Sequence, residues 1–157
     1  MMGGRVETMF EMQKIEPEAA RQRAERAARF LAADPRVKLV YLFGSTATPE
    51  RKIPVRDVDL AVLMDPPLRL WDFLRFRADV VEAAGGEIDL VPLDKAGVVL
   101  AHEVIDAGRC LYANPPELET DFTVRTNLRY LDFKPFLKEQ WKIAGERLEE
   151  RLRGRAS

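Results

Sequence analysis

The stretch that decides the fold is VKLVYLFGSTATPERKIPVRDVDLAVL, residues 37–63. Its first seven residues, 37–43, are rich in β-branched and aromatic side chains and predict a strand. Gly44-Ser45 ends this strand abruptly. A polar segment follows up to Arg56 and is expected to be a loop or short helix. Residues 57–63 then predict a second strand of the same sheet.

Outside this stretch, helices and strands continue to alternate. Helical spacing of apolar residues predicts helices at 18–33, 68–84 and 96–106, and strands are predicted at 87–92 and, at a sheet edge, 109–112. A long helical region runs from 117 to about 153. Pro135 must kink or split it, because proline lacks the backbone donor. The fold class is therefore α/β (α+β), with helices packed on one sheet whose strand order stays open.

Composition excludes several classes of protein. The chain has 157 residues, a net charge of -1, one cysteine and one histidine. A disulfide framework and a Cys-rich zinc site are excluded, so carboxylates must hold any metal, which points to Mg²⁺ or Mn²⁺. The charge balance does not indicate direct nucleic-acid binding. No stretch predicts a membrane span or a secretory signal, and we expect a cytoplasmic protein.

Three carboxylates carry the candidate chemistry. Asp57 and Asp59 are two positions apart in a predicted strand, which puts both on one face, with Cα atoms ~6–7 Å apart. Such neighbours repel unless a divalent cation neutralises them. If the strand at 87–92 is adjacent, Asp89 completes a cluster able to hold two Mg²⁺ ions ~3.5–4 Å apart for phosphoryl transfer.

Gly44-Ser45 would form the other side of such a site. Glycine lets the backbone approach a ligand closely, and amides at the start of a turn or helix favour phosphate oxygens. Taken alone, an Asp-x-Asp at the start of a strand is usually a structural feature, and a Gly-Ser pair occurs in any turn. Their combination, at this spacing and followed by the Ile88-Asp89-Leu90 strand, is much less common.

These segments resemble a known family. They are Tyr41-Leu42-Phe43-Gly44-Ser45, Asp57-Val58-Asp59-Leu60-Ala61-Val62 and Ile88-Asp89-Leu90-Val91, with Ala107-Gly108-Arg109-Cys110-Leu111-Tyr112 and Tyr130-Leu131-Asp132-Phe133 further along. They are similar to the minimal nucleotidyltransferases (MNT) of the DNA polymerase β superfamily. The last segment is similar to a helix of the antitoxin branch, which is paired with HEPN-domain ribonuclease toxins.

The resemblance implies a mixed sheet flanked by helices, with MgATP bound at its edge. Gly44 and Ser45 would contact the phosphates. Asp57 and Asp59 would bind the metals, and Asp89 would share a metal and help to deprotonate the acceptor hydroxyl. The branch is described as adenylylating a tyrosine of its toxin.

The sequence also departs from the family pattern. Thr48-Pro49 replaces the frequent Arg-Gly after Ala47, so that a basic residue is missing unless Arg51 or Lys52 replaces it. Arg56 stands where serine is frequent, and we assign it to nucleotide binding or to screening of the carboxylates.

Two functions from different classes follow. The first is a magnesium-dependent nucleotidyltransferase that moves AMP from ATP to a hydroxyl of a HEPN toxin and so acts as an antitoxin. The alternative is an antitoxin that neutralises its toxin by direct binding, with catalysis weak or lost. Transfer to a small molecule ranks third, because the chain leaves little room for a second substrate domain.

We divide the chain into a tail or short helix (1–16), the nucleotidyltransferase domain (17–114) and C-terminal helices (115–157). An apolar stripe in the last part has helical spacing: Phe136, Leu137, Trp141, Ala144, Leu148 and Leu152. It either packs on its own domain or meets a partner, and homo-oligomerisation stays open. His102 is interpreted as a partly exposed helix residue, and Cys110 as a small core residue.

Overall fold

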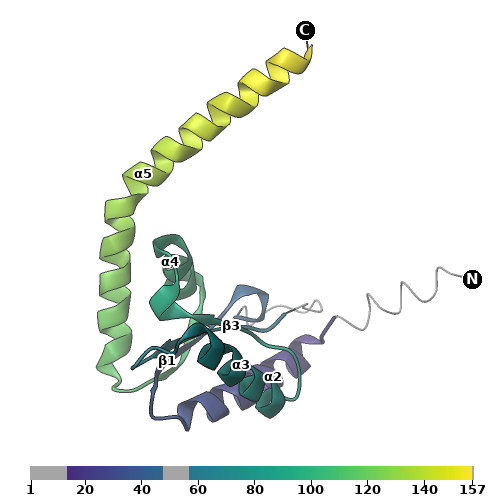
Figure 1. Cartoon of the computed structure of the whole chain (residues 1–157), viewed down its shortest axis with the longest axis vertical. Coiled ribbons are helices and arrows are strands. Elements are labelled where there is room, and N and C mark those ends of the chain that lie inside the picture. Colours follow the sequence, from purple (N-terminus) through teal and green to yellow (C-terminus); the bar gives the residue numbers. More distant parts are fainter. Residues whose placement is uncertain (1–13, 48–56, 157) are drawn as a thin grey trace, which may run out of the picture.

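The computed structural model describes residues 14–47 and 57–156. Within them, helices and strands alternate along the chain (Figure 1). In order, the elements are α2 (Pro17–Ala32), β1 (Val37–Phe43), the 3₁₀ turn η1 (Gly44–Ala47), β2 (Asp59–Met64), α3 (Leu70–Ala84), β3 (Asp89–Pro92), the 3₁₀ turn η2 (Leu93–Lys95), α4 (Val98–Ala107), β4 (Arg109–Ala113) and α5 (Glu117–Ala156). The predicted α/β (α+β) class and the alternation are confirmed.

The four strands form one mixed sheet in the order β3-β2-β1-β4. β1 pairs antiparallel with both β2 and β4, whereas β2 pairs parallel with β3. The parallel pair needs a crossover connection, which α3 supplies. β4 lies at an edge, as predicted. The adjacency of β2 and β3 was a condition of the predicted carboxylate cluster, and it holds.

Helices cover both faces of the sheet. In Figure 1, α2 and α3 lie side by side on one face, and α4 with the first part of α5 lies on the other. Alternate residues of the central strands therefore enter two cores: Val40, Leu42, Leu60 and Val62 pack under α2 and α3, and Leu39, Tyr41 and Ala61 pack under α4 and α5. Burial on both faces explains why β1 is an almost continuous apolar run.

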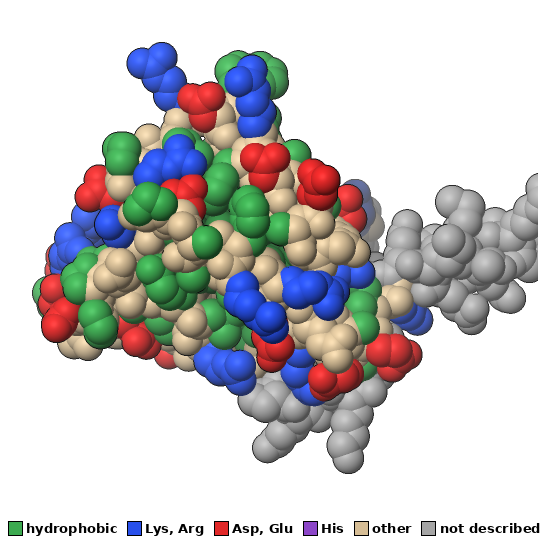
Figure 2. All heavy atoms as spheres, turned by 90° about the horizontal axis from the view of Figure 1, so that it is seen from below, with side chains coloured by type: hydrophobic (Ala, Val, Ile, Leu, Met, Phe, Trp, Pro, Cys, Tyr) green, Lys and Arg blue, Asp and Glu red, His purple; other side chains and the backbone are tan. Residues whose placement is uncertain are grey.

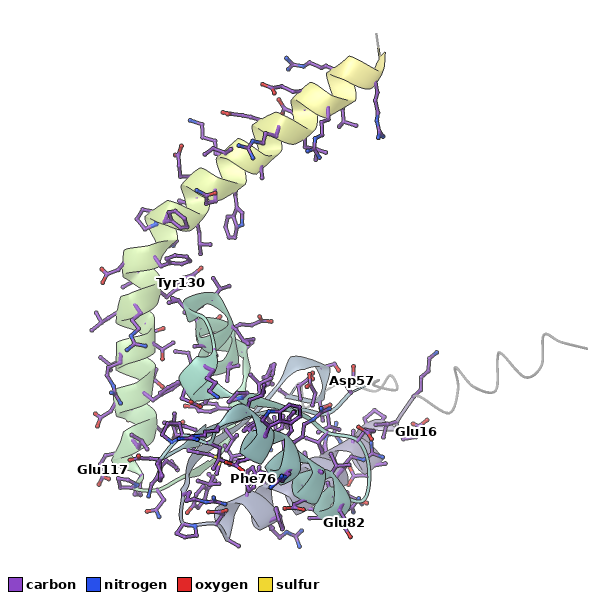
Figure 3. The ribbon with its side chains drawn as sticks, viewed as in Figure 1. Glu16, Asp57, Phe76, Glu82, Glu117 and Tyr130 are labelled. Atoms are coloured by element: carbon purple, nitrogen blue, oxygen red, sulfur yellow. The ribbon has the colours of Figure 1, made fainter. Side chains whose placement is uncertain are left out.

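α5 is a single helix of 40 residues, about 60 Å long at the usual rise per residue. Pro135 lies inside it, and Figure 3 shows α5 bending shortly after Tyr130. Proline therefore kinks this helix without splitting it, which decides between the two predicted outcomes. The first part of α5 contacts α4, β1 and β4, and the rest projects beyond the sheet domain (Figure 1).

Two strand starts differ from the sequence predictions. β2 begins at Asp59, so Asp57 and Val58 precede it, and β3 begins at Asp89 rather than at residue 87. The predicted turn after β1 is the 3₁₀ turn η1, and residues 48–56 lie outside the described part of the chain. The remaining predicted helices and strands agree with the structure to within about three residues at either end.

The outer surface of the α2 and α3 layer carries charges of both signs. Figure 2 shows Lys and Arg side chains interspersed with Asp and Glu side chains and apolar ones on this face. None of the helices in the described ranges has the length and apolar character needed to cross a bilayer. The cytoplasmic location and the three-part division of the chain stay predictions.

Candidate nucleotidyltransferase site

The centre of the candidate site is a pair of aligned aspartates on β2 and β3. Asp59 is the first residue of β2 and pairs with Phe43 of β1 on one side and with Asp89 of β3 on the other. The parallel register therefore brings two carboxylates to the same end of the sheet. The backbone amide of Asp89 also donates to the Val58 carbonyl at 2.9 Å, which fixes the start of the register.

Gly44 brings the turn after β1 against the Asp59 carboxylate. Its φ is +70°, a left-handed conformation that favours glycine. A Cβ atom at this position would collide with Asp59 Oδ2. Glycine is required here for two reasons, the backbone angle and the close approach. Ser45 follows in η1 and is half-buried.

Asp57 lies just ahead of β2 with an exposed side chain. The Thr46 hydroxyl of η1 donates to the Asp57 carbonyl at 3.1 Å, and the neighbouring Val58 is fully buried. These contacts tie the segment before β2 to the turn after β1. In Figure 3 Asp57 lies on the far side of the domain from Glu117, the first residue of α5.

The electrostatics of Asp59 link the three carboxylates. The pKa of Asp59 is raised to about 6, mainly by burial and also by the negative charges of Asp89 and Asp57 and a hydrogen bond to Asp89. A half-buried carboxylate facing two others is poorly stabilised without a cation. The donor set consists of carboxylate oxygens, which suits Mg²⁺ or Mn²⁺.

The carboxylates are close without forming a finished metal cage. In the described ranges, no group of three or more His, Cys, Asp or Glu side chains is arranged around a common point for a metal ion. The structure thus brings Asp57, Asp59, Asp89, Gly44 and Ser45 to one end of the sheet. The residues assigned to phosphate contact in the polar segment, Arg56 and the alternatives Arg51 and Lys52, lie outside the described residues, as do Thr48 and Pro49.

Three arginines hold the connection that delivers Asp89 to the site. Arg26 Nε of α2 donates to the Ala84 carbonyl at 2.9 Å, and an Arg23 guanidinium nitrogen donates to the Glu87 carbonyl at 3.3 Å. Arg77 Nε of α3 donates to the Ile88 carbonyl at 3.4 Å. These residues could not be recognised from the sequence, because arginines on an amphipathic helix look like an ordinary solvated face.

A hollow of about 280 Å³ lies between α4, α5 and the end of β2, and its lining includes Leu63, Asp94, Phe122, Arg125 and Arg129. Leu63 shares the sheet face of Asp59 and lies four residues along β2, about 13 Å away. Both apolar and cationic groups line the hollow. The hollow could not be predicted from the sequence, because its lining residues come from four separate segments.

His102 and Cys110 each pack against neighbouring residues of the fold. The His102 ring on α4 stacks on the Tyr130 ring of α5, with centroids 3.6 Å apart and planes 9° apart. Cys110 is half-buried on β4, and its thiol contacts the Tyr112 carbonyl at 3.4 Å. Neither position indicates a catalytic role.

The family model described as polymerase beta nucleotidyltransferase matches residues 25–117, which contain Gly44, Asp57, Asp59 and Asp89. The chain belongs to this family. The predicted relation to the polymerase β superfamily is therefore confirmed, and the matched region spans the whole sheet. No curated protein matches the chain.

The chain is also similar to solved structures of MNT antitoxins. A toxin–antitoxin MntA-HpeT mutant is 25% identical with a TM-score of 0.61, covering 75% of this chain and 93% of its own. A toxin–antitoxin structure with AMP-PNP is 25% identical with a TM-score of 0.61, covering 79% and 94%. The tri-AMPylated Shewanella oneidensis HEPN toxin in complex with MNT antitoxin gives 25% identity, a TM-score of 0.57, and coverage of 83% and 97%.

Proposed function

We propose that this chain transfers AMP from MgATP to a tyrosine hydroxyl of a HEPN-domain toxin, and so acts as the antitoxin of a toxin–antitoxin pair. The observation that carries the proposal is the alignment of Asp59 with Asp89 beside the left-handed turn at Gly44. Carboxylates at the end of a sheet, next to a turn that admits close backbone approach, suit a metal-bound triphosphate.

Each residue has a distinct role in the proposed reaction. Asp57, Asp59 and Asp89 would hold two Mg²⁺ ions, which when bound neutralise the triphosphate and the developing charge. Gly44 and Ser45 would contact phosphate oxygens, with Arg56 as a further contact. The acceptor oxygen forms a bond to the α-phosphorus, the bond to pyrophosphate breaks, and Asp89 accepts the hydroxyl proton.

Two relatives support the choice of nucleotide and acceptor. One similar structure contains AMP-PNP, an ATP analogue, and another contains an AMPylated HEPN toxin with an MNT antitoxin. The raised pKa of Asp59 supports the binding of a metal ion, because a cation would relieve the repulsion between Asp59 and its carboxylate neighbours.

The test is transfer of label from ATP labelled at the α-phosphate. Purified protein and Mg²⁺ are added to a lysate of the native host, with Asp57→Asn/Asp59→Asn in parallel. Asp79→Asn, at an exposed site on α3, is the matched control. We expect one labelled protein with the wild type and the control, and none with the double variant. Label in a small molecule, or transfer that survives in the double variant, would contradict the proposal.

A second candidate function is neutralisation by contact alone. Apolar side chains that α5 leaves exposed, among them Trp141 and Leu148, favour it. In that case a well-folded protein would transfer no label but would still suppress the toxin's ribonuclease activity. The Asp57→Asn/Asp59→Asn variant would then suppress it equally well.

A further inference from the structure

We propose that the distal arm of α5, defined as residues 134–155, is the docking surface for the partner protein, and that this partner presents an apolar groove edged by Asp and Glu side chains. The inference rests on the proposed function, because the partner is the toxin named there. It adds which surface of this chain makes the contact and what chemistry the opposite surface has.

The distal arm carries an apolar stripe that the domain does not cover. The stripe consists of Leu137, Trp141, Ala144, Leu148 and Leu152, which lie within about 40° of one line at 100° per residue. Trp141 is 65% exposed, and Leu148 and Leu152 are each 58% exposed. Figures 1 and 3 show the arm projecting past α4 into open space. Such a stripe costs hydration free energy unless another surface covers it.

Charge is sorted around the stripe. The charged residues within about 80° of its centre line are all cations: Lys134, Lys138, Arg151 and Arg155. The acidic residues Glu139, Glu146 and Glu150 lie about 160–180° away, and the other cations, Lys142, Arg147 and Arg153, lie about 100–140° away. Glu149 lies to one side and pairs with Arg153 at 3.8 Å. Within the described ranges, no carboxylate forms an ion pair with Lys134, Lys138 or Arg151. The cations beside the stripe are therefore available to an acidic partner.

This arrangement disfavours two other occupants. In a second copy packed stripe to stripe, the flanking cations of one arm would face those of the other, and like charges repel. An anionic membrane would attract the cations, but a helix that lies on a membrane has a basic polar face. Here the back of the arm is mixed, because Glu139, Glu146 and Glu150 lie there with Lys142 and Arg153. A protein groove with an acidic edge satisfies both the stripe and its flanks.

The docking surface and the catalytic residues are separate. Asp57 lies across the domain from α5, so changes on the arm leave the carboxylates in place (Figure 3). We therefore expect arm variants to alter the affinity for the partner and its KM in AMP transfer, while kcat at saturating partner stays unchanged.

The experiment measures binding of the full-length chain to the purified HEPN-domain toxin of the same host. Leu148→Gln is compared with Leu128→Gln, because both leucines are 58% exposed on α5 but point to different sides. We expect Leu148→Gln to weaken binding at least tenfold and Leu128→Gln to change it less than twofold. Circular dichroism checks that α5 remains helical in both.

Charge reversal provides an independent pair of variants. Lys138→Glu/Arg151→Glu reverses two cations beside the stripe, and Lys142→Glu/Arg153→Glu reverses two cations towards the back of the arm. Both carry the same net charge. We expect only the first pair to weaken binding more than tenfold and to flatten its dependence on salt.

Several results would overturn this inference and are separable from failure of the proposed function. Binding unchanged in Leu148→Gln, with AMP transfer intact, would remove the docking surface and leave the function standing. Binding lost in Leu148→Gln, with no AMP transfer by the wild type, would remove the proposed function and leave the docking surface standing. A dimer of the chain alone that Leu148→Gln dissociates would assign the stripe to a second copy. Cosedimentation with vesicles of equal phosphatidylglycerol and phosphatidylcholine, lost in Leu148→Gln, would assign it to a membrane.

Discussion

Asp59 on β2 and Asp89 on β3 are partners in a parallel register, so their carboxylates lie side by side at one end of the sheet. Antiparallel hairpins bring together residues that are near in sequence, but this pair is 30 positions apart. The crossover through α3 makes the alignment possible. The arginine contacts to the carbonyls of Ala84, Glu87 and Ile88 hold the connection that ends at Asp89.

Asp59→Asn is expected to stabilise the metal-free protein at neutral pH. Folding raises the pKa of Asp59 from 3.8 to about 6, so folding favours the protonated form. The stability that this provides is present below pH 4 and is lost as the pH rises through 6. At pH 7.5 the asparagine variant should gain about 1 kcal/mol, less than a fully buried group would give, because Asp59 is half exposed.

Urea unfolding with a chelator present, at pH 4 and at pH 7.5, measures this effect. The advantage of the variant should shrink at the lower pH, and Asp79→Asn should show no such change. A loss of stability in Asp59→Asn at pH 7.5 would mean that the carboxylate makes favourable contacts in the folded protein. Added Mg²⁺ should raise the Tm of the wild type more than that of the variant.

Gly44→Ala is expected to damage the site, and Gly85→Ala is its matched control. Both glycines have left-handed φ values, +70° and +75°, so alanine strains the backbone by about 1 kcal/mol at either position. Only at Gly44 would the new Cβ collide with the Asp59 carboxylate; at Gly85 the nearest atom is an Arg26 nitrogen 3.8 Å away.

Calorimetric titration with a non-hydrolysable ATP analogue and Mg²⁺ checks this difference. We expect Gly44→Ala to lose nucleotide binding and Gly85→Ala to keep it, although both variants lose stability through backbone strain. Equal affinities in the two variants would show that the turn at Gly44 does not form part of the nucleotide site.

Tyr41→Phe is expected to leave stability unchanged or to raise it by up to about 1 kcal/mol. The Tyr41 side chain is 3% exposed, and its hydroxyl forms no hydrogen bond within the described part of the chain, although Thr123 lies nearby. Burial raises the pKa of Tyr41 to about 12. Removing an unsatisfied buried hydroxyl removes its desolvation cost. Thermal unfolding measures the effect, and a Tm lowered by several degrees would reveal a hydrogen bond to the hydroxyl.

Pro135→Ala is expected to straighten α5. Proline lacks the backbone donor and its ring disturbs the preceding turn, so alanine is favoured by about 3 kcal/mol inside a helix. The distal arm should then continue along the axis of the first part of α5. Small-angle scattering should show a larger maximum dimension than for the wild type. An unchanged dimension would mean that contacts around Tyr130, and not the proline, set the bend.

Much of the local structure could be predicted from the sequence. The run at 37–43 is apolar, β-branched and bounded by Gly44, so its length and type as a strand follow from local chemistry. The start of α2 at Pro17 and the end of α3 at Ala84, directly before Gly85, follow from local preferences for proline and glycine at helix ends in the same way. The predicted strand starts at Asp57 and Glu87 were each two residues too early. These residues are polar, and pairing with neighbouring strands decides where a strand begins.

The sequence by itself determined which residue types are available for chemistry: three aspartates, a Gly-Ser turn, and no cysteine or histidine cluster. These residue types predict a site for a cation with oxygen ligands, next to a phosphate group. Only the tertiary structure decided that Asp89 stands beside Asp59, that the Gly44 turn contacts this carboxylate, and that the distal arm of α5 leaves its stripe uncovered. The physical reason is that strand order, close approach and burial depend on contacts between distant segments, which hydrophobic periodicity does not encode.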